Sequence, residues 1–158
     1  GLEFRRVLFR SKVAQSKRQI ARLKQISATE EIDGNLLKHD ALFRRKLASI
    51  EIDLMALEYT ELRLLSDLSK GRTPGPESSL LKIRGTEIQQ KITELLVESV
   101  GYYAQPYLPE VLYEGREDCV VGPEYAPGLA PYYFNWRKAS ITGGTNEIQR
   151  NIMDGGRN

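Results

Sequence analysis

The sequence has very few of the residues that form cross-links or metal sites. Its 158 residues include one cysteine, Cys119, and one histidine, His39. A single cysteine cannot form an internal disulfide, and this cysteine and histidine match no spacing typical of metal ligands. We therefore expect no metal site. The cysteine usage fits a reducing compartment, which favours a cytoplasmic location.

Long apolar runs and a strong charge of one sign are also missing. No segment approaches the roughly 20 apolar residues that span a bilayer, and no signal-peptide pattern is visible. The net charge of +2, from 23 basic and 21 acidic residues, creates no strong field for nucleic acid. We expect neither a membrane span nor a nucleic-acid partner. The apolar content of 41% is enough for one domain with its own core.

The chain does contain three long segments with apolar residues at helical spacing: residues 12–29, 41–68 and 77–100. Asp40 is a good cap for the second segment. Gly85, on the apolar face of the third, predicts a close helix crossing. Because short turns join the segments, we predict an all-α fold, an antiparallel up-down bundle of long helices.

Residues 101–134 have a different composition, rich in proline and tyrosine. They predict one long structured loop, and such loops are usually functional or interfacial. The alternative is a loop laid over the end of the bundle, with tyrosines that cover apolar surface. The only strand signal is a weak one at residues 119–121.

Near the carboxyl end, two adjacent glycines precede a residue suited to start a helix. Gly143 and Gly144 allow positive φ, and the hydroxyl of Thr145 can cap the next helix. The first amides of such a helix favour phosphate or another electron-rich group. The alternative is a plain connection between two helices.

Residues 139–152, Ala-Ser-Ile-Thr-Gly-Gly-Thr-Asn-Glu-Ile-Gln-Arg-Asn-Ile, resemble the carboxyl-terminal signature of the acyl-CoA dehydrogenases. In that family a helix starts beside the flavin after such a turn. Residues 78–90, the tyrosine-rich loop and residues 132–138 are similar to one branch, that of the pimeloyl-CoA dehydrogenase large subunit. The resemblance implies the helical carboxyl-terminal domain of an FAD enzyme, without the family's amino-terminal helical and middle β domains.

The resemblance covers residues 12–152, and the two ends fall outside it. Residues 1–11 do not join naturally onto the helical segment at residues 12–29, and their end, Leu-Phe-Arg-Ser, matches one translation of a sequencing adaptor. We expect these residues to be a non-native leader. The alternative is the amphipathic start of the first helix. Residues 153–158 look like a truncated tail.

The resemblance also implies cofactor-binding residues, in two groups. Thr145 matches a threonine at the helix start that contacts the flavin cofactor, Glu147 matches a residue near its adenosine end, and Gly144 lies between them. Glu98 and Gly101 stand where the family has a Gln-x-x-Gly-Gly turn that touches the cofactor of a neighbouring subunit, although that motif is not reproduced.

A further position is Arg22, near the place of an arginine that reaches the flavin diphosphate in other members. The usual Arg-x-x-Phe motif is not reproduced here. The alternative for Arg22 is a solvated helix arginine.

The implied reaction is α,β-dehydrogenation of an acyl-CoA thioester. A desolvated glutamate removes the α proton, and a hydride passes to the flavin N5. Many members carry this glutamate at the position of Gly143, which has no side chain, and others carry it near the start of the first helix. That second position falls at or upstream of residues 1–11, where Glu3 is the only carboxylate. We predict that the chain has no competent catalytic base.

These observations lead to one main hypothesis and two alternatives. The first is a fragment of an FAD-dependent acyl-CoA dehydrogenase that contributes flavin contacts and an oligomer interface and is inactive alone. Its implied partners are the acyl-CoA substrate, an electron-transfer flavoprotein or similar acceptor, and further subunits in a homo- or hetero-oligomer. The second is a non-catalytic helical interaction module or a subunit of a heteromeric dehydrogenase. The third, a coiled-coil adaptor, does not explain the Gly-Gly-Thr turn.

Overall fold

The structure, a computed structural model, describes residues 2–73 and 75–155, with side chains from residue 12 onward except at position 117. Its regular elements are six α-helices and one short hairpin: α1 (Leu2–Ser27), β1 (Glu31–Ile32), β2 (Asn35–Leu36), α2 (Ala41–Ser69), α3 (Glu77–Val100), α4 (Pro109–Glu114), α5 (Leu129–Arg137) and α6 (Asn146–Gly155). Short 3-10 turns occupy several of the connections. The all-α fold predicted from the sequence is confirmed.

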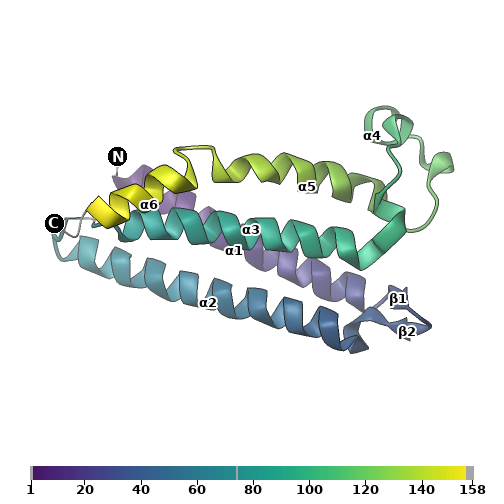
Figure 1. Cartoon of the computed structure of the whole chain (residues 1–158), viewed down its shortest axis with the longest axis horizontal. Coiled ribbons are helices and arrows are strands. Elements are labelled where there is room, and N and C mark those ends of the chain that lie inside the picture. The colour runs from purple at the N-terminus through teal and green to yellow at the C-terminus, as the bar shows by residue number, and fades with distance from the viewer. Residues whose placement is uncertain (1, 74, 156–158) are drawn as a thin grey trace.

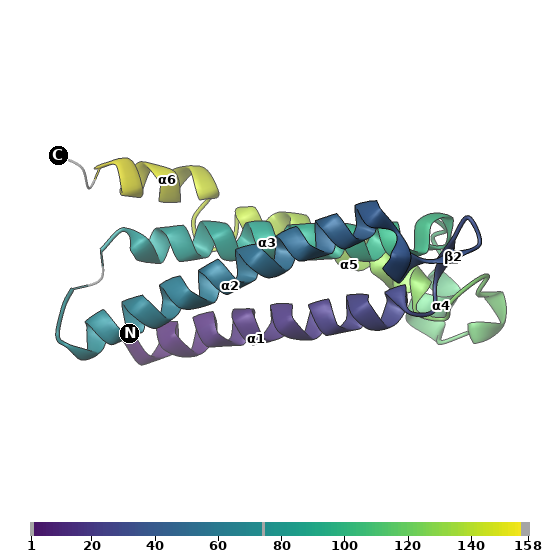
Figure 2. The same ribbon diagram turned by 90° about the horizontal axis from the view of Figure 1, so that it is seen from below.

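The long helices form an up-down bundle with α3 at its centre. α1, α2 and α3 alternate in direction, and α5 returns antiparallel along α3 (Figures 1 and 2). α3 contacts each of α1, α2, α5 and α6. The amino-terminal ends of α1 and α3 therefore lie at the same end of the bundle as α6, whereas the β1–β2 hairpin and α4 lie at the opposite end (Figure 1).

Capping and hydrophobic periodicity explain the boundaries and orientation of α2. Asp40 Oδ1 accepts a hydrogen bond from the amide of Phe43 at 2.7 Å, so the predicted cap is confirmed. The helix buries one stripe against α1 and α3, made of Phe43, Leu47, Ile50, Leu54 and Leu57. Burial of each such side chain contributes about 1.5–3 kcal/mol, which outweighs the weak propensity differences along the helix.

The centre of the core lies on α3. Ile92 and Leu96 are both fully buried, and α3 has buried residues around much of its circumference. A helix that is packed by neighbours on several sides needs this pattern. Gly85 does not mark a tight crossing, because an added Cβ would meet only Leu57 Cδ2, at 3.8 Å. That prediction is wrong.

The region after α3 is not one long loop. Residues 109–114 and 129–137 are helical, and α5 packs along α3. Gln90 and Arg137 join the two helices, because each side chain donates to the other residue's carbonyl oxygen, at 3.3 and 3.1 Å. The weak strand signal is also wrong, since none of residues 119–121 is in a strand. Asp33 and Gly34 form the tip of the hairpin, and both residues have positive φ, 52° and 77°.

The backbone of residues 2–11 belongs to α1. The division into a non-native leader (1–11), a domain (12–152) and a truncated tail (153–158) stays a prediction, and positions 1 and 156–158 lie outside the described residues. In the described part of the chain, no helix combines the length and apolar character needed to cross a membrane.

Candidate cofactor-contacting turn

The turn that leads into α6 has the backbone predicted from its sequence. Gly143 and Gly144 have φ values of 74° and 94°, a region that L side chains rarely adopt. Thr145 then caps α6, because its hydroxyl oxygen accepts a hydrogen bond from the amide of Ile148 at 3.2 Å. The first turn of α6 therefore points its remaining amides away from the helix, where they favour negative charge.

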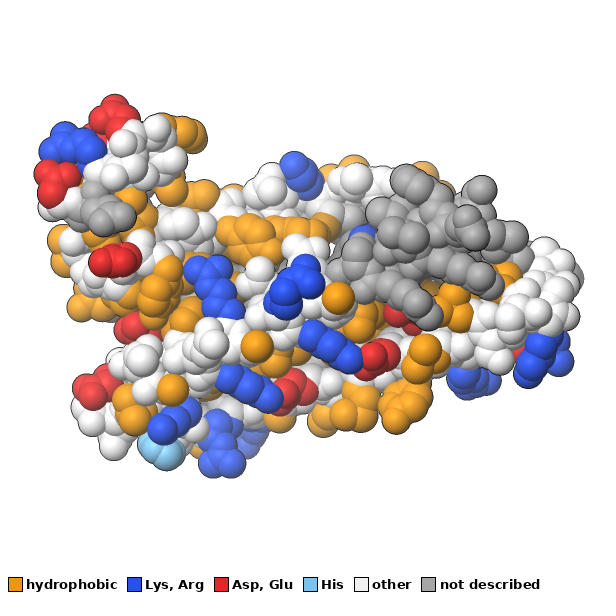
Figure 3. Space-filling view, turned by 180° about the vertical axis from the view of Figure 1, so that it is seen from behind, with side chains coloured by type: hydrophobic (Ala, Val, Ile, Leu, Met, Phe, Trp, Pro, Cys, Tyr) orange, Lys and Arg blue, Asp and Glu red, His pale blue; other side chains and the backbone are white. Residues whose placement is uncertain are grey.

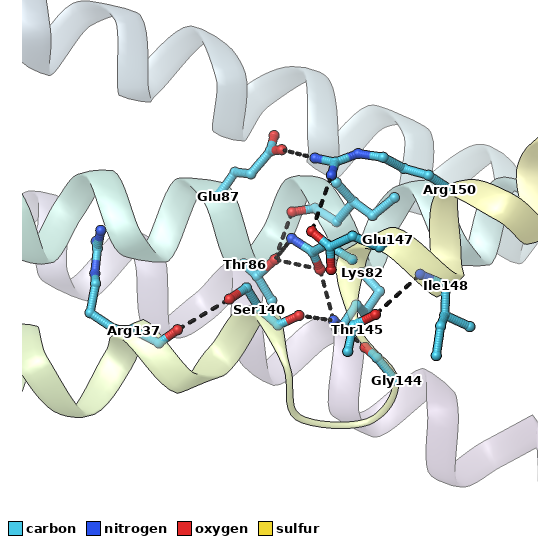
Figure 4. A network of polar contacts seen from close by, with 12 residues as sticks. Lys82, Thr86, Glu87, Arg137, Ser140, Gly144, Thr145, Glu147, Ile148 and Arg150 are labelled. Atoms are coloured by element: carbon cyan, nitrogen blue, oxygen red, sulfur yellow. Dashed lines mark hydrogen bonds and ion pairs between the residues drawn. The ribbon is translucent and has the colours of Figure 1, made fainter.

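A lysine from α3 holds this turn in place (Figure 4). Lys82 Nζ donates to the carbonyl oxygen of Gly144 at 2.6 Å, to Asn146 Oδ1 at 2.8 Å and to the carbonyl oxygen of Ser140 at 3.3 Å. The ammonium group has three donors, so these three acceptors use all of them. Lys82 thus fixes both sides of the turn to one point on α3.

A second polar contact joins the start of α6 to the same helix. Asn146 is only 6% exposed, and its Nδ2 donates to Thr86 Oγ1 at 3.3 Å. The hydroxyl of Thr86 in turn donates to the carbonyl oxygen of Ile83 at 2.8 Å. Because Asn146 is the buried residue of α6, these polar contacts rather than apolar burial position the helix.

The charges around the turn are mixed. Burial lowers the pKa of Lys82, the nearby Lys12 lowers it further, and Glu147 opposes both. The pKa of Glu147 is lowered chiefly by its own backbone amide, and the Thr145 hydroxyl adds to the effect. Glu147 also pairs with Arg150 at 3.6 Å. The carboxylate of Glu147 therefore stays ionised at the exposed edge of the turn.

The outer side of the turn is open. Among the described residues, a Cβ built at Gly143 would meet no atom within 4 Å, whereas one at Gly144 would come within 2.8 Å of Gln149 Nε2. The described side chains therefore leave space beside Gly143 for another group. That group can approach the backbone closely, which is a common use of glycine at binding turns.

A cavity of about 270 Å³ lies close to the turn, between α1, α3 and the segment that joins α5 to α6. Trp136, Lys12 and Lys138 contribute to its lining together with Gln89, which is 1% exposed. Gln89 Oε1 has no hydrogen-bond donor among the residues described. Burial lowers the pKa of Lys12. The lining thus combines a tryptophan, two lysines and a buried glutamine.

The predicted cofactor-binding residues do not form one cluster in the chain. Gly144, Thr145 and Glu147 lie together beside Lys82, near the start of α3. Glu98 and Gly101 lie at the other end of α3, about 24 Å from Lys82 at a rise of 1.5 Å per residue.

Each residue of the distant group has a local structural role. Glu98 pairs with Lys46 of α2 at 2.6 Å, and Gly101, with φ of 54°, ends α3. The guanidinium of Arg22 stacks over the ring of Tyr125 at 5.9 Å from its centroid. Whether any of these residues binds a cofactor stays a prediction.

Sequence reasoning missed Lys82, Thr86 and the buried amide of Asn146. Helical periodicity treats a lysine as part of the solvated face, and two of the acceptors of Lys82 are backbone carbonyl groups, which leave no mark in a sequence. These acceptors lie 58 to 64 residues away along the chain. Asn146 lies in the signature, between Thr145 and Glu147. This position was the one sequence feature that could have indicated its part in anchoring the turn.

The comparisons with solved structures concern the fold. The chain superposes on butyryl-CoA dehydrogenase from Megasphaera elsdenii with a TM-score of 0.71 and 16% identity, over 96% of this chain and 35% of that one. The structure described as PigA with FAD and proline superposes with a TM-score of 0.73 and 15% identity, over 98% of this chain and 36% of that one. A chain of the ChsE4–ChsE5 complex from Mycobacterium tuberculosis superposes with a TM-score of 0.63 and 22% identity, over 92% of this chain and 34% of that one. The chain thus spans about a third of these proteins. No curated protein matches the sequence.

The family model of the acyl-CoA dehydrogenase C-terminal domain matches residues 2–155. The chain therefore belongs to the acyl-CoA dehydrogenase family, through its carboxyl-terminal domain.

Proposed function

We propose that the chain is the helical carboxyl-terminal part of an FAD-dependent acyl-CoA dehydrogenase, which forms the α,β-double bond of an acyl-CoA thioester. Its role there is to present the turn at residues 143–145 to the flavin and to supply part of an oligomer interface. The observation that carries the proposal is the anchoring of this turn by Lys82, which sets the start of α6 in one orientation.

The residues at the turn fit a flavin cofactor in two respects. No described atom lies within 4 Å of a Cβ built at Gly143, so another group can approach the backbone there, and the start of α6 favours an electron-rich edge. Thr145 and Gly144 would hold the cofactor, and Glu147 would lie toward its polar end. When bound, FAD supplies the acceptor for the hydride that leaves the substrate.

We propose that the proton-abstracting base is the part of the chemistry that this chain does not supply. Gly143 occupies the position at which many family members carry the glutamate. The alternative position is near the start of the first helix, where the side chains are not among those that the structure describes. We therefore propose that the chain is inactive by itself. Acyl-chain length and the electron acceptor, an electron-transfer flavoprotein or a similar protein, belong to the complete enzyme.

The second candidate function is a non-catalytic helical subunit of a heteromeric dehydrogenase. The same absence of a side chain at Gly143 favours it, because such a subunit needs no base. The similarity to the pimeloyl-CoA dehydrogenase large subunit fits this candidate as well as the first, since that branch pairs large and small subunits.

The direct test is the source DNA upstream of the codon for Lys12. An open frame that encodes a middle β domain and an amino-terminal helical domain supports the proposal, and a different kind of domain contradicts it. The purified chain alone should be colourless and form no enoyl-CoA from acyl-CoA substrates. A stoichiometric flavin absorbance together with enoyl-CoA formation would show that the chain is complete for catalysis.

A further inference from the structure

The proposed function makes no use of the cavity between α1, α3 and the segment that joins α5 to α6. Of the described residues that line it, none is among the six predicted to bind a cofactor. Its volume of about 270 Å³ lies near the lower end of small-molecule sites, which begin at about 300 Å³. At about 30 Å³ per water molecule, this is the room of about nine waters, or of an organic molecule with roughly ten non-hydrogen atoms.

The cavity carries positive charge without a counter-ion. Among the described residues, Lys12 and Lys138 contribute to its lining and no carboxylate does. Neither ammonium group has an ion pair within the part of the chain that the structure describes. By contrast, blue and red side chains alternate on the face formed by α1 and α2 (Figure 3), where Lys17 pairs with Glu58 at 2.6 Å. A bound anion would balance the charge at the cavity.

Lys12 in particular lacks a partner for its charge. Burial lowers the pKa of Lys12, because its ammonium group has lost part of its hydration. Lys82 lies close enough for the two positive charges to repel each other. A carboxylate in the cavity would replace the lost hydration with charge-assisted hydrogen bonds. Lys138 is exposed, so its side chain can turn toward the same carboxylate.

A buried amide supplies a second specific feature. Gln89 is 1% exposed and lines the cavity, and its Oε1 atom has no hydrogen-bond donor among the residues described. The other amide atom, Nε2, is already used, because it donates to the buried hydroxyl of Ser16. A buried acceptor without a donor costs free energy, so native proteins rarely leave one unsatisfied. A ligand with a hydroxyl group would supply the missing donor.

The lining also offers apolar surface. Trp136 and Ala139 contribute to it, and Gly85 adds no side chain of its own. An indole ring presents a large apolar area to a flat or hydrocarbon group. The cavity therefore suits an organic anion with an apolar body better than an inorganic anion such as phosphate.

We propose that this cavity binds a small hydroxycarboxylate with an apolar body. The carboxylate lies between Lys12 and Lys138, the hydroxyl donates to Gln89 Oε1, and the body packs against Trp136. Because roughly ten non-hydrogen atoms contribute to binding, we expect a dissociation constant on the order of 1 mM. The inference goes beyond the proposed function and needs no flavin, so either one can fail while the other stands.

The fluorescence of Trp136 tests the proposal, because it is the only tryptophan of the sequence. Titration of the full chain with 3-phenyllactate, a hydroxycarboxylate of this size, should change the fluorescence in a saturable way. Two analogues should each bind about tenfold more weakly: 3-phenylpropionate, which lacks the hydroxyl, and 3-phenyllactamide, which lacks the charge. The absence of a saturable change with 3-phenyllactate, or equal affinity for all three compounds, overturns the proposal.

Substitutions assign the two polar contacts. Lys138→Gln, at an exposed position that should not disturb folding, should weaken 3-phenyllactate about tenfold and leave 3-phenyllactamide unchanged. Lys38→Gln is the matched control, because Lys38 is also exposed but does not line the cavity. Gln89→Met removes the amide at similar size and should abolish the preference for 3-phenyllactate over 3-phenylpropionate. Equal effects of the two lysine variants, or a preference that survives in Gln89→Met, would refute the assignment of the site.

Discussion

Replacement of Lys82 by methionine removes the anchor of the candidate turn while it keeps an unbranched side chain that is one atom shorter. Two short bonds, to Gly144 at 2.6 Å and to Asn146 at 2.8 Å, are lost together with a longer one to Ser140. Hydrogen bonds to a charged group contribute about 1.5–3 kcal/mol each when buried. Lys82 is only partly buried, so we take about 2 kcal/mol for the whole set.

This loss should be local. Because α6 has only Asn146 as a buried residue, little apolar area leaves the core when the helix detaches. The free energy of local opening of α6 should fall by about 2 kcal/mol, which corresponds to a roughly 30-fold faster amide exchange in that helix. The free energy of global unfolding should fall by no more than the same amount, since the cores of α1, α2 and α3 are untouched.

Hydrogen–deuterium exchange followed by mass spectrometry measures this effect peptide by peptide. Lys91→Met is the matched control, because Lys91 makes an exposed pair with Asp53 and should leave the exchange of α6 unchanged. Unchanged exchange of residues 146–155 in Lys82→Met would refute the idea that Lys82 positions the turn. Equal acceleration in both variants would do the same, because it would point to a general loss of charge.

Two further predictions concern Tyr125 and the glycine turn. Burial and the hydrogen bond to Glu30 raise the pKa of Tyr125 from 10.0 to about 12. The folded state therefore keeps a proton that the unfolded state loses, so the free energy of unfolding should fall as pH rises from 10 to about 12. Tyr125→Phe should lose this part of the pH dependence in denaturant titrations, and an unchanged profile would count against it. Gly144→Ala should destabilise the turn by about 1–2 kcal/mol because of its φ of 94°, whereas Gly85→Ala, at an ordinary helical site with space for a Cβ, should stabilise slightly. Chemical denaturation measures both, and equal effects would refute the backbone argument.

The parts of the fold that depend on local chemistry were predictable. Asp40 starts α2 because its carboxylate accepts a hydrogen bond from the backbone amide three residues later. The apolar stripe of α2 is visible in the sequence. Gly143 and Gly144 adopt the positive φ that two adjacent glycines allow, and the Thr145 hydroxyl caps the helix that follows. The turn could therefore be predicted residue by residue.

The parts that depend on distant neighbours were not predictable. α5 has Pro131 in its first turn and aromatic residues without a clear helical period, and the packing of α5 on α3 gives it stability. Lys82 belongs to the same class, because a single long-range juxtaposition with α6 converts a surface-type residue into an anchor. Propensity and periodicity contain no information on such pairs.

The division of the predicted cofactor residues between two ends of α3 has a consequence for assembly. Under the proposed function, the turn at residues 143–145 serves one flavin, and Glu98 and Gly101, by the family resemblance, serve the flavin of a neighbouring subunit. Because α3 separates the two groups by about 24 Å, the proposed function implies that one flavin site would be completed only when another subunit docks.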